Sequence, residues 1–274
     1  MSTASPLDYE YLRGVVMRNS GNQVDPSRDY LFESRLQRLL RERGMQSISQ
    51  LVSALRAESG PTLQRSVAEA MTINETSFFR DTSTFDYLRE ALLPAIIENR
   101  RETRTLRFWS GASSSGQEAY STAIMLREYF PQLAGWRIDI LGTDLSAEMV
   151  ERSSSGRYQR IEINRGLPAR FLVQYFVRTG DEWEVHPDIK RICRFQQRNL
   201  CQNSFVHETF DVIFLRNVMI YFPQETRRQV LLTMHRALAP DGVLLLGLSE
   251  QPRMDSHWQT MLTPKTVWYK PIRP

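Results

Sequence analysis

The stretch RFWSGASSSGQEAYS, residues 107–121, places a loop of small residues after a short apolar run and before a helical pattern. A strand, a tight turn and a helix in this order let the backbone approach a ligand closely. Gly111 and Gly116 are spaced as G-x-x-x-x-G, without the GK[ST] ending of a P-loop or the GxGxxG of a dinucleotide site. Taken alone, the loop is equally compatible with a tight turn that binds nothing.

Strand-like and helix-like segments alternate beyond this stretch. Helices are expected at residues 117–130 and 226–239. The expected strands are LRFWS (106–110), WRIDILGTD (136–144), DVIFL (211–215), GVLLLGL (242–248) and TVWYK (266–270). Such alternation predicts an α/β fold with a doubly wound parallel sheet. In these sheets, ligands bind at the carboxyl ends of the strands.

Residues 167–198 interrupt the alternation. Their first part, which ends near Phe176, predicts a helix. The rest contains a Thr-Gly-Asp turn (179–181) and the alternating stretches WEV (183–185) and ICRF (192–195). This pattern predicts a small antiparallel insertion in the α/β domain.

The N-terminal segment predicts several short helices. In YLFESRLQRLLRERG (30–44) the apolar residues follow 3.6-residue spacing, and Gly44 is placed as a C-cap, so we expect one helix. The apolar positions are Phe32, Leu36, Leu39 and Leu40. Arg35, Arg38 and Arg41 lie outside this stripe and form a basic flank. Such a flank is either a solvated face or a surface that attracts an acidic partner.

A polar stretch, NETSFFRD (74–81), joins the helical and α/β patterns. We expect Phe78 and Phe79 either to anchor it between the two domains or to be ordinary core residues. The predicted parts are a helical domain (1–72), a linker (73–89) and an α/β domain (90–274) with a helix and β-subdomain inserted at about 167–198.

Composition excludes several classes of protein. With 274 residues, of which 41% are hydrophobic, the chain can bury a core. Its two cysteines form no CxxC pattern and have no histidine at ligand spacing, which predicts no disulfide framework, no metal site and a reducing, cytoplasmic location. No apolar run approaches the roughly 20 residues that span a bilayer. The net charge of +4 reflects either composition alone or attraction to an acidic partner.

Polar residues close several of the expected strands. Asp144, at the tip of the second strand, is placed to accept hydrogen bonds from ribose hydroxyls. Alternatively it caps the next helix, although Ser146 could supply that cap. Glu118 lies in the first turn of a helix, where it also complements the helix dipole. Asn199 and Asn217 follow strand-like segments, where contacts to a ligand are expected. The loop of small residues at 111–116 and the acid at Asp144 together favour a cofactor that contains adenosine.

In this order, the motifs resemble the chemotaxis receptor methyltransferase (CheR) family over nearly the whole chain. NETSFFRD looks like the N-E-T-x-F-F-R element of that family, and RFWSGASSSGQEAYSTAIM like its first cofactor motif. The stretches ILGTDLS, RNL, FDVIFLRNVMIYF and LAPDGVLLLGLSE follow in the order of the family. The resemblance implies a helical N-terminal domain, a class I (Rossmann-like) methyltransferase sheet and an inserted antiparallel β-subdomain.

The resemblance also implies S-adenosylmethionine as methyl donor and glutamate side chains of a membrane chemoreceptor as acceptors. Position by position, it places the following residues at the cofactor: Asn74, Thr76, Arg80, Gly111, Glu118, Asp144, Asn199, Leu200, Arg216 and Asn217. Three features depart from the family pattern. Gln117-Glu118-Ala119 replaces a more acidic run that contains proline, although Glu118 itself is kept. Serines 113–115 replace a cysteine and threonine, and the turn in VRTGDEWEV (177–185) is shorter than in members that bind a receptor's C-terminal pentapeptide. We therefore expect receptor binding without that tether.

The expected chemistry fits the residue inventory. A glutamate has a pKa near 4.3, so it is ionised at pH 7 and needs no general base. The histidines of the chain all lie outside the motifs, and no metal is required. We hypothesise that Arg80 orients the substrate carboxylate and that Tyr221 is a neighbouring hydrogen-bond donor. Alternatively, Arg80 only pairs with Asp81 or Asp86.

Two other classes of function remain as alternatives. A nucleic-acid methyltransferase would suit the basic pI, but the chain has neither a basic patch with interleaved aromatics nor a cysteine in a catalytic motif. A signalling regulator that binds the cofactor without turnover is the second alternative. A nicotinamide oxidoreductase is disfavoured because GxGxxG is absent. We expect no partnership with nucleic acid and no insertion into a membrane.

Overall fold

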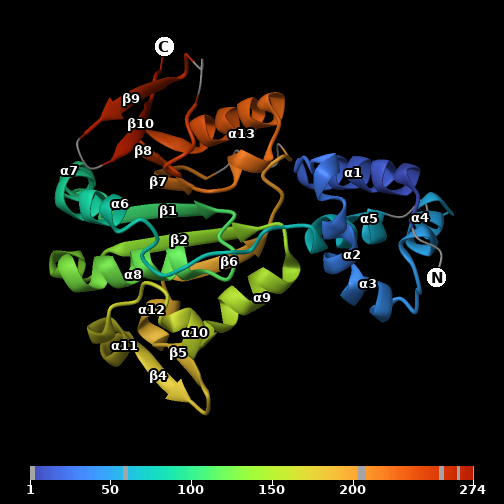
Figure 1. Cartoon of the computed structure of the whole chain (residues 1–274). Helices are drawn as coiled ribbons and strands as arrows, with labels where there is room; N and C mark the ends of the chain where they lie inside the picture. The colour runs from blue at the N-terminus through green and yellow to red at the C-terminus, as the bar shows by residue number, and fades with distance from the viewer. Residues whose placement is uncertain (1–3, 58–60, 203–207, 253–255, 264–265, 274) are drawn as a thin grey trace. The chain divides into compact units, whose positions relative to one another are not determined.

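The computed structural model describes residues 4–57, 61–202, 208–252, 256–263 and 266–273 (Figure 1). The chain divides into two compact units. The helical unit contains the residues up to Ile73 together with Tyr221–Arg227, and the α/β unit contains Asn74–Ile220 and the residues from Arg228 onward. In these described ranges, no helix combines the length and apolarity needed to cross a membrane.

Helix α1 (Pro6–Ser20) opens the helical unit. It begins with a capping box, in which Ser5 and Asp8 satisfy each other's backbone N–H, and ends at Gly21 with φ 74°. The unit continues with η1 (Pro26–Arg28), α2 (Tyr30–Arg35), α3 (Gln37–Glu42), α4 (Ile48–Ala57) and α5 (Pro61–Ala70). Its core is apolar and includes Leu12, Phe32, Leu51 and Val67, all fully buried.

The single helix expected over residues 30–44 is instead two short helices, α2 and α3, which meet at Leu36. Leu36 has ψ −5°, which bends the chain while its N–H still bonds to Phe32. The apolar stripe itself is confirmed, because Phe32, Leu36 and Leu39 are buried and Leu40 is half-buried. Leu36 thus packs into the core at the point where the chain bends, and the spacing of the apolar residues does not predict this bend.

A seven-stranded sheet with the order β6-β2-β1-β7-β8-β10-β9 forms the centre of the α/β unit (Figure 1). The first five of these strands are parallel, and β10 is antiparallel to both of its neighbours. The strands are β1 (Thr105–Gly111), β2 (Arg137–Asp144), β6 (Cys193–Gln197), β7 (Phe210–Leu215), β8 (Leu238–Leu246), β9 (Trp258–Leu262) and β10 (Val267–Pro271). The predicted Rossmann-like α/β fold is confirmed. Every residue of β7 is buried, as expected for a central strand covered on both faces.

Helices connect the parallel strands. Those of the α/β unit are α6 (Thr82–Tyr87), η2 (Leu88–Leu92), α7 (Leu93–Asn99), α8 (Gln117–Tyr129), η3 (Pro131–Leu133), α9 (Ala147–Ser155), α10 (Arg160–Ile163), α11 (Ala169–Tyr175) and α12 (Pro187–Lys190). Two further elements, η4 (Met219–Tyr221) and α13 (Gln224–Ala237), contain residues of both units.

The segment η2 is a π-helical turn, in which the N–H of Leu93 bonds five residues back to Leu88. Pro94 has no N–H, so the wider turn precedes the point where the ladder would be interrupted.

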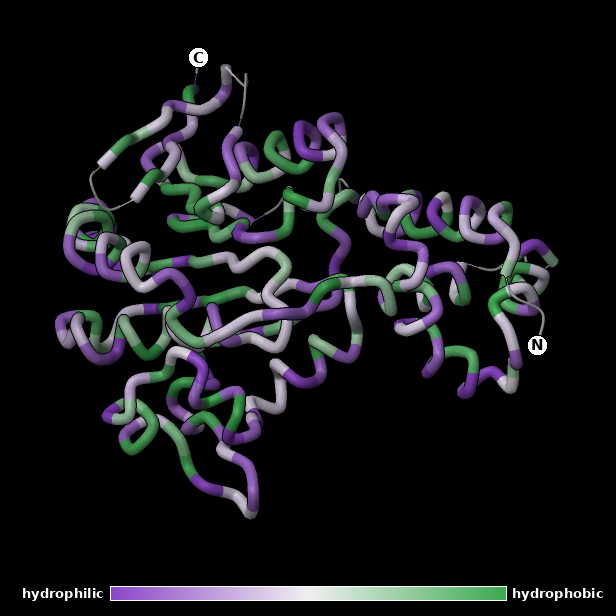
Figure 2. Tube along the Cα trace, in the orientation of Figure 1, coloured by the Kyte–Doolittle hydropathy of each residue, from purple (hydrophilic) through white to green (hydrophobic). Residues whose placement is uncertain are grey.

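A second, three-stranded antiparallel sheet of order β3-β5-β4 is inserted between β2 and β6. It consists of β3 (Arg157–Gln159), β4 (Phe176–Thr179) and β5 (Glu182–Val185). The predicted antiparallel insertion and the helix ending near Phe176 are confirmed. Figure 2 shows the tip of the β4–β5 hairpin as hydrophilic.

Three strand assignments differ from the prediction. Strand β3 was missed, and it lies before the expected start of the insertion at residue 167. ICRF does not belong to the insertion, because β6 pairs in parallel with β2 at the edge of the main sheet. An edge strand is incompletely covered, so its sequence alternates like that of an antiparallel strand. Strand β9 was missed, although it pairs with β10 over five residue pairs.

Phe78 lies in the hydrophobic core of the α/β unit, and Phe79 is partly buried and packs against that core, as the core alternative predicts. Phe78 is fully buried, and its ring meets Tyr158 edge-on with 5.0 Å between the ring centroids. The backbone of Phe78 also passes close to Gly166, where an added Cβ would lie 2.1 Å from the Phe78 carbonyl oxygen. NETSFFRD is therefore fixed by close packing within the α/β unit.

Substitution of Gly166 by alanine should destabilise the protein more than the same change at Gly180. Both glycines have positive φ, 88° and 64°, so both variants acquire strain of about 1–2 kcal/mol. Only Gly166→Ala also meets the Phe78 carbonyl, since the described residues leave the space within 4 Å of the Gly180 Cβ open. Overpacking should cost about a further 1–3 kcal/mol. Urea unfolding measures the difference, and equal losses in the two variants would contradict the close contact.

Candidate functional site

The loop after β1 is joined to the end of β2 by backbone hydrogen bonds. The N–H of Ser113 donates to the Thr143 carbonyl at 2.9 Å, and the N–H of Ser114 donates to the Asp144 carboxylate at 2.8 Å. Ala112 and Ser114 both have positive φ, 56° and 50°. This conformation is uncommon for residues with a Cβ, and strained backbone of this kind is concentrated at ligand sites.

Asp144 is buried at the tip of β2 and organises the backbone around it. One carboxylate oxygen accepts from Ser114, and the other accepts from the N–H of Ser146 at 2.9 Å. The cap of α9 comes from the Ser146 hydroxyl, which accepts from Met149, so Asp144 is not the cap. A carboxylate has about four acceptor positions and can still bind hydroxyl donors.

Tyr158, which the sequence analysis missed, supports the same loop from the small sheet. Its hydroxyl donates to the Ser115 carbonyl at 2.6 Å. Complete burial raises the pKa of Tyr158 well above its usual value, so the hydroxyl remains protonated and acts as a donor. Only its position in an alternating stretch hinted at a buried residue.

Arg216 is a buried cation that binds several groups near the ends of β1 and β7. Its Nη1 lies 2.8 Å from Glu118, and its Nη2 donates to Asp81 at 2.5 Å and to the Arg80 carbonyl at 2.8 Å. Glu118 in turn accepts from the Ser110 hydroxyl at 2.7 Å. The Arg216 side chain is 2% exposed, and its Nε has no hydrogen-bond partner among the described residues.

Three residues of NETSFFRD carry predicted roles at the cofactor. The carbonyl of Asn74 accepts from the Ser114 hydroxyl at 2.7 Å, which ties this segment to the first loop. Arg80 Nη1 donates to the Glu75 carbonyl at 3.0 Å. The ion pairs considered for Arg80 are made by other arginines, since Asp81 pairs with Arg216 and Asp86 with Arg89. Thr76 is half-buried.

Asn217 follows Arg216 and has a left-handed backbone with φ 59°. Its side-chain Oδ1 is buried and finds no partner in the described part of the chain. The backbone around it is held by Glu250, a residue with no role in the sequence analysis beyond ending the stretch LAPDGVLLLGLSE. A carboxylate directly after an apolar strand was the available signal.

The remaining residues predicted to bind the cofactor are Asn199, Leu200 and Gly111. Asn199 Oδ1 accepts from the N–H of Cys201 at 2.9 Å, and Leu200 is buried. A Cβ at Gly111 would lie 3.3 Å from Leu215 and 3.4 Å from Leu200. Close approach of these side chains explains the glycine at position 111.

The other predicted residues belong to the helical unit. The carbonyl of Tyr221 accepts from the N–H of Gln23 at 2.8 Å. Arg35 Nη1 donates to the Met71 and Thr72 carbonyls at the end of α5. Arg38 pairs with Glu42 at 2.8 Å, and both Arg38 and Arg41 are exposed. The three arginines therefore differ: Arg35 holds its own unit together, and the other two face solvent.

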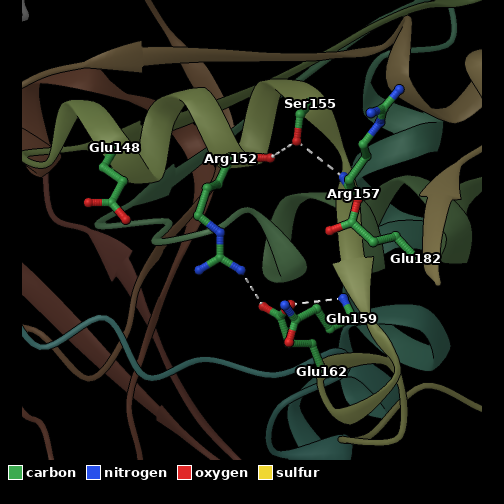
Figure 3. Close-up of a pocket in the computed structure, with 7 residues that line it drawn as sticks. All are labelled: Glu148, Arg152, Ser155, Arg157, Gln159, Glu162 and Glu182. Carbon is green, nitrogen blue, oxygen red and sulfur yellow. Dashed lines mark hydrogen bonds and ion pairs between the residues drawn. The ribbon is translucent and has the colours of Figure 1, made fainter. Parts of the chain in front are cut away.

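A pocket of about 600 Å³ lies elsewhere in the α/β unit, between α9, β3, α10 and β5 (Figure 3). Two of its charged side chains bind each other: Arg152 lies 2.7 Å from Glu162, which also accepts from the N–H of Gln159. The predicted site residues are not among those that line it. We assign no ligand to this pocket.

The sequence profile described as "CheR methyltransferase, SAM binding domain" matches residues 74–267, and "CheR methyltransferase, all-alpha domain" matches residues 7–72. The chain belongs to the CheR methyltransferase family. Its relatives include chemotaxis protein methyltransferase 1 of Pseudomonas aeruginosa, 35% identical over 98% of this chain and 99% of that protein. Chemotaxis protein methyltransferase Cher2 of Pseudomonas putida is likewise 35% identical over 98% of this chain and 99% of its own length. The chemotaxis protein methyltransferase of Vibrio parahaemolyticus is 36% identical over 90% of each chain.

Membership in the CheR family makes the α/β unit a methyltransferase domain that binds S-adenosylmethionine. The residues at the strand ends fit this cofactor. Asp144 is a buried carboxylate at the tip of β2, the kind of group that accepts from ribose hydroxyls. Asn217 Oδ1 is buried without a partner among the described residues, which suits a hydrogen-bond donor. Ala112 and Ser114 give the first loop a positive-φ backbone, and strained backbone of this kind is concentrated at ligand sites.

Replacing Arg216 by methionine should lower the free energy of unfolding by about 3–5 kcal/mol, because the change leaves Glu118 and Asp81 without their buried partner. Arg89 offers a matched control. It also contacts two carboxylates, Asp86 and Glu90, but is 27% exposed, so Arg89→Met should cost at most about 1 kcal/mol. Urea unfolding compares the two variants, and similar losses would show that burial of Arg216 is not decisive.

Proposed function

We propose that this CheR-family protein transfers the methyl group of S-adenosylmethionine to glutamate side chains in the cytoplasmic domain of a chemoreceptor. The products are glutamyl methyl esters and S-adenosylhomocysteine, and the protein acts in the cytoplasm. The observation that carries this proposal is the near full-length similarity to proteins named chemotaxis protein methyltransferase. The polar groups gathered at the ends of β1, β2 and β7 support it.

The chemistry requires little proton transfer. When bound, S-adenosylmethionine supplies a methyl group activated by its sulfonium. An acceptor glutamate is already ionised at neutral pH, so its carboxylate is nucleophilic without a general base. The protein's task is to hold the acceptor in line and exclude water, and orientation of this kind can supply about 7–11 kcal/mol.

Arg80 is suited to orient the acceptor. Its Nη1 donates to the Glu75 carbonyl, and a guanidinium has five N–H donors, so it can hold this backbone and a carboxylate together. Its own carbonyl is fixed by Arg216. A very strong grip would stabilise the carboxylate before reaction and slow the transfer. We therefore assign Arg80 to orientation, with Tyr221 as a hydrogen-bond donor to the acceptor.

The cysteines disfavour a nucleic-acid methyltransferase that works through a thiolate. Burial raises the pKa of Cys201 to about 11 and that of Cys193 further, so both thiols are protonated at neutral pH. The chain contains only these two cysteines. Methylation of nucleic acid is therefore only an alternative outcome of the labelling experiment.

Receptor binding without a pentapeptide tether is part of the proposal. Strands β4 and β5 pair up to Thr179 and Glu182, so a two-residue turn, Gly180-Asp181, joins them. Such a short turn leaves little loop to hold a peptide. The helical unit would instead dock through Arg38 and Arg41, whose positive charge suits an acidic receptor helix.

The decisive experiment combines binding and labelling. S-adenosylhomocysteine calorimetry establishes cofactor binding, and labelled S-adenosylmethionine is then incubated with receptor fragments. We expect label that is released by mild base as methanol and that disappears when the acceptor glutamates are changed to alanine. Binding without labelling would favour a regulator without turnover, whereas base-stable label in RNA or DNA would favour the nucleic-acid enzyme.

Arg80→Ala should reduce the rate of receptor methylation at least 100-fold, because the acceptor is no longer held in line. The fold should remain intact, since Arg80 contributes its side chain to one partly exposed contact with Glu75. Arg101→Ala is a control, because Arg101 is 77% exposed and pairs only with a surface glutamate. Near-normal turnover of Arg80→Ala would exclude the orienting role.

Charge reversal of Arg38 and Arg41 to glutamate should raise the KM for receptor several-fold and weaken its dependence on salt, with kcat nearly unchanged. Arg35 is left intact, because its bonds to Met71 and Thr72 stabilise the unit. Arg101→Glu serves as a reversal of one exposed arginine in the other unit. If the KM for receptor and its salt dependence did not change, Arg38 and Arg41 would be an ordinary solvated surface without a docking role.

A further inference from the structure

We propose that Glu250 is a positioning residue of the cofactor site, which fixes the backbone that presents Asn217. The inference rests on S-adenosylmethionine binding by the family and is independent of the acceptor proposed above. Glu250 touches neither the acceptor nor the reacting atoms in this proposal. It acts by holding the turn between β7 and η4 in one conformation.

The carboxylate of Glu250 collects four backbone N–H groups. Its Oε2 accepts from Asn217 at 2.7 Å and from Gly247 at 2.8 Å. Its Oε1 accepts from Val218 at 3.0 Å and from Ile220 at 3.3 Å. Glu250 is 5% exposed, so these charge-assisted bonds form away from water.

The turn depends on this carboxylate because the sheet no longer supports it. Strand β7 ends at Leu215, and the N–H groups of Asn217, Val218 and Ile220 point instead to Glu250. Asn217 also has φ 59°, a left-handed conformation that is uncommon outside glycine, although asparagine tolerates it better than most residues. Several backbone donors facing one carboxylate make that conformation the stable one.

Gly247 shows how tightly the turn is packed against the end of β8. A Cβ at this position would lie 2.6 Å from Glu250 Oε2 and 2.9 Å from the Asn217 nitrogen. Strands β7 and β8 are parallel neighbours, with Leu215 opposite Leu246. Glu250 therefore links the carboxyl ends of two adjacent strands. Ligands of α/β sheets bind at these strand ends.

The turn presents the side chain of Asn217, which carries the acceptor that the cofactor would use. Asn217 Oδ1 is buried without a hydrogen-bond partner among the described residues. Because protein groups do not fix this oxygen, its position follows from the backbone of Asn217, and thus from Glu250. A cofactor with N–H and O–H donors supplies the kind of partner that such an acceptor requires.

Glu250→Gln tests the proposal on the full chain. A glutamine keeps the shape, but its NH2 group faces N–H donors and cannot accept from them. We expect the Kd for S-adenosylhomocysteine to rise about tenfold, as is common when a group that orients a ligand-binding residue is changed. Isothermal calorimetry measures the Kd, and urea unfolding establishes that the variant is folded.

A double-mutant cycle separates positioning from general destabilisation. Asn217→Gly removes the amide and accepts positive φ without strain. In that background, Glu250→Gln should change the Kd less than twofold, although it should lower stability as before. A tenfold change in both backgrounds would mean that Glu250 does not act through Asn217, and would overturn the proposal.

Asp211→Asn is the matched control. Asp211 is a buried carboxylate at the opposite end of β7 that binds Arg100 and the N–H of Arg107. Its loss should lower stability and leave the Kd unchanged. If Glu250→Gln does not fold, Glu250→Asp carries the test, because it keeps the charge and shortens the reach. A folded Glu250 variant with wild-type Kd contradicts the proposal, whether or not receptor methylation is ever detected.

Discussion

A buried guanidinium is the interaction on which the arrangement of the site depends. Arg216 binds Glu118 at the start of α8, and Asp81 and the Arg80 carbonyl just before α6. These segments are far apart in sequence, since Arg216 follows Glu118 by 98 positions and Asp81 by 135 positions. A charge that is almost fully withdrawn from water needs such partners. The conformation of NETSFFRD and the end of β7 are therefore determined together.

The two sides of one turn are held by opposite charges. Arg216 reaches toward NETSFFRD, whereas the N–H of the next residue, Asn217, donates to Glu250. Neighbouring residues are thus attached to different parts of the α/β unit. The polar floor of the site is consequently stiff, although most of its members lie in loops, which are usually the mobile parts of a domain.

Local patterns predicted most of the α/β unit because each strand, turn and helix is encoded within about a dozen residues. The strands β1, β2, β7 and β8 and the helix α8 follow directly from apolar runs and periodicity. The sequence could not predict which sheet β6 would join, since an edge strand and an antiparallel strand alternate alike. Tyr158 and Glu250 were missed for a related reason: Ser115 lies 43 positions from Tyr158, and Asn217 lies 33 positions from Glu250, beyond the reach of any local pattern.

The position of Glu250 in the sequence also determines when, during translation, the turn at Asn217 acquires its anchor. It follows Asn217 by 33 residues, and it is the acceptor for the turn's backbone donors. At typical translation rates, roughly 2–7 s separate the synthesis of the two residues. Until then the turn lacks its anchor, even though β1, β2 and β7 are already present. A nascent chain therefore completes this binding surface late, when synthesis of the catalytic domain is nearly finished.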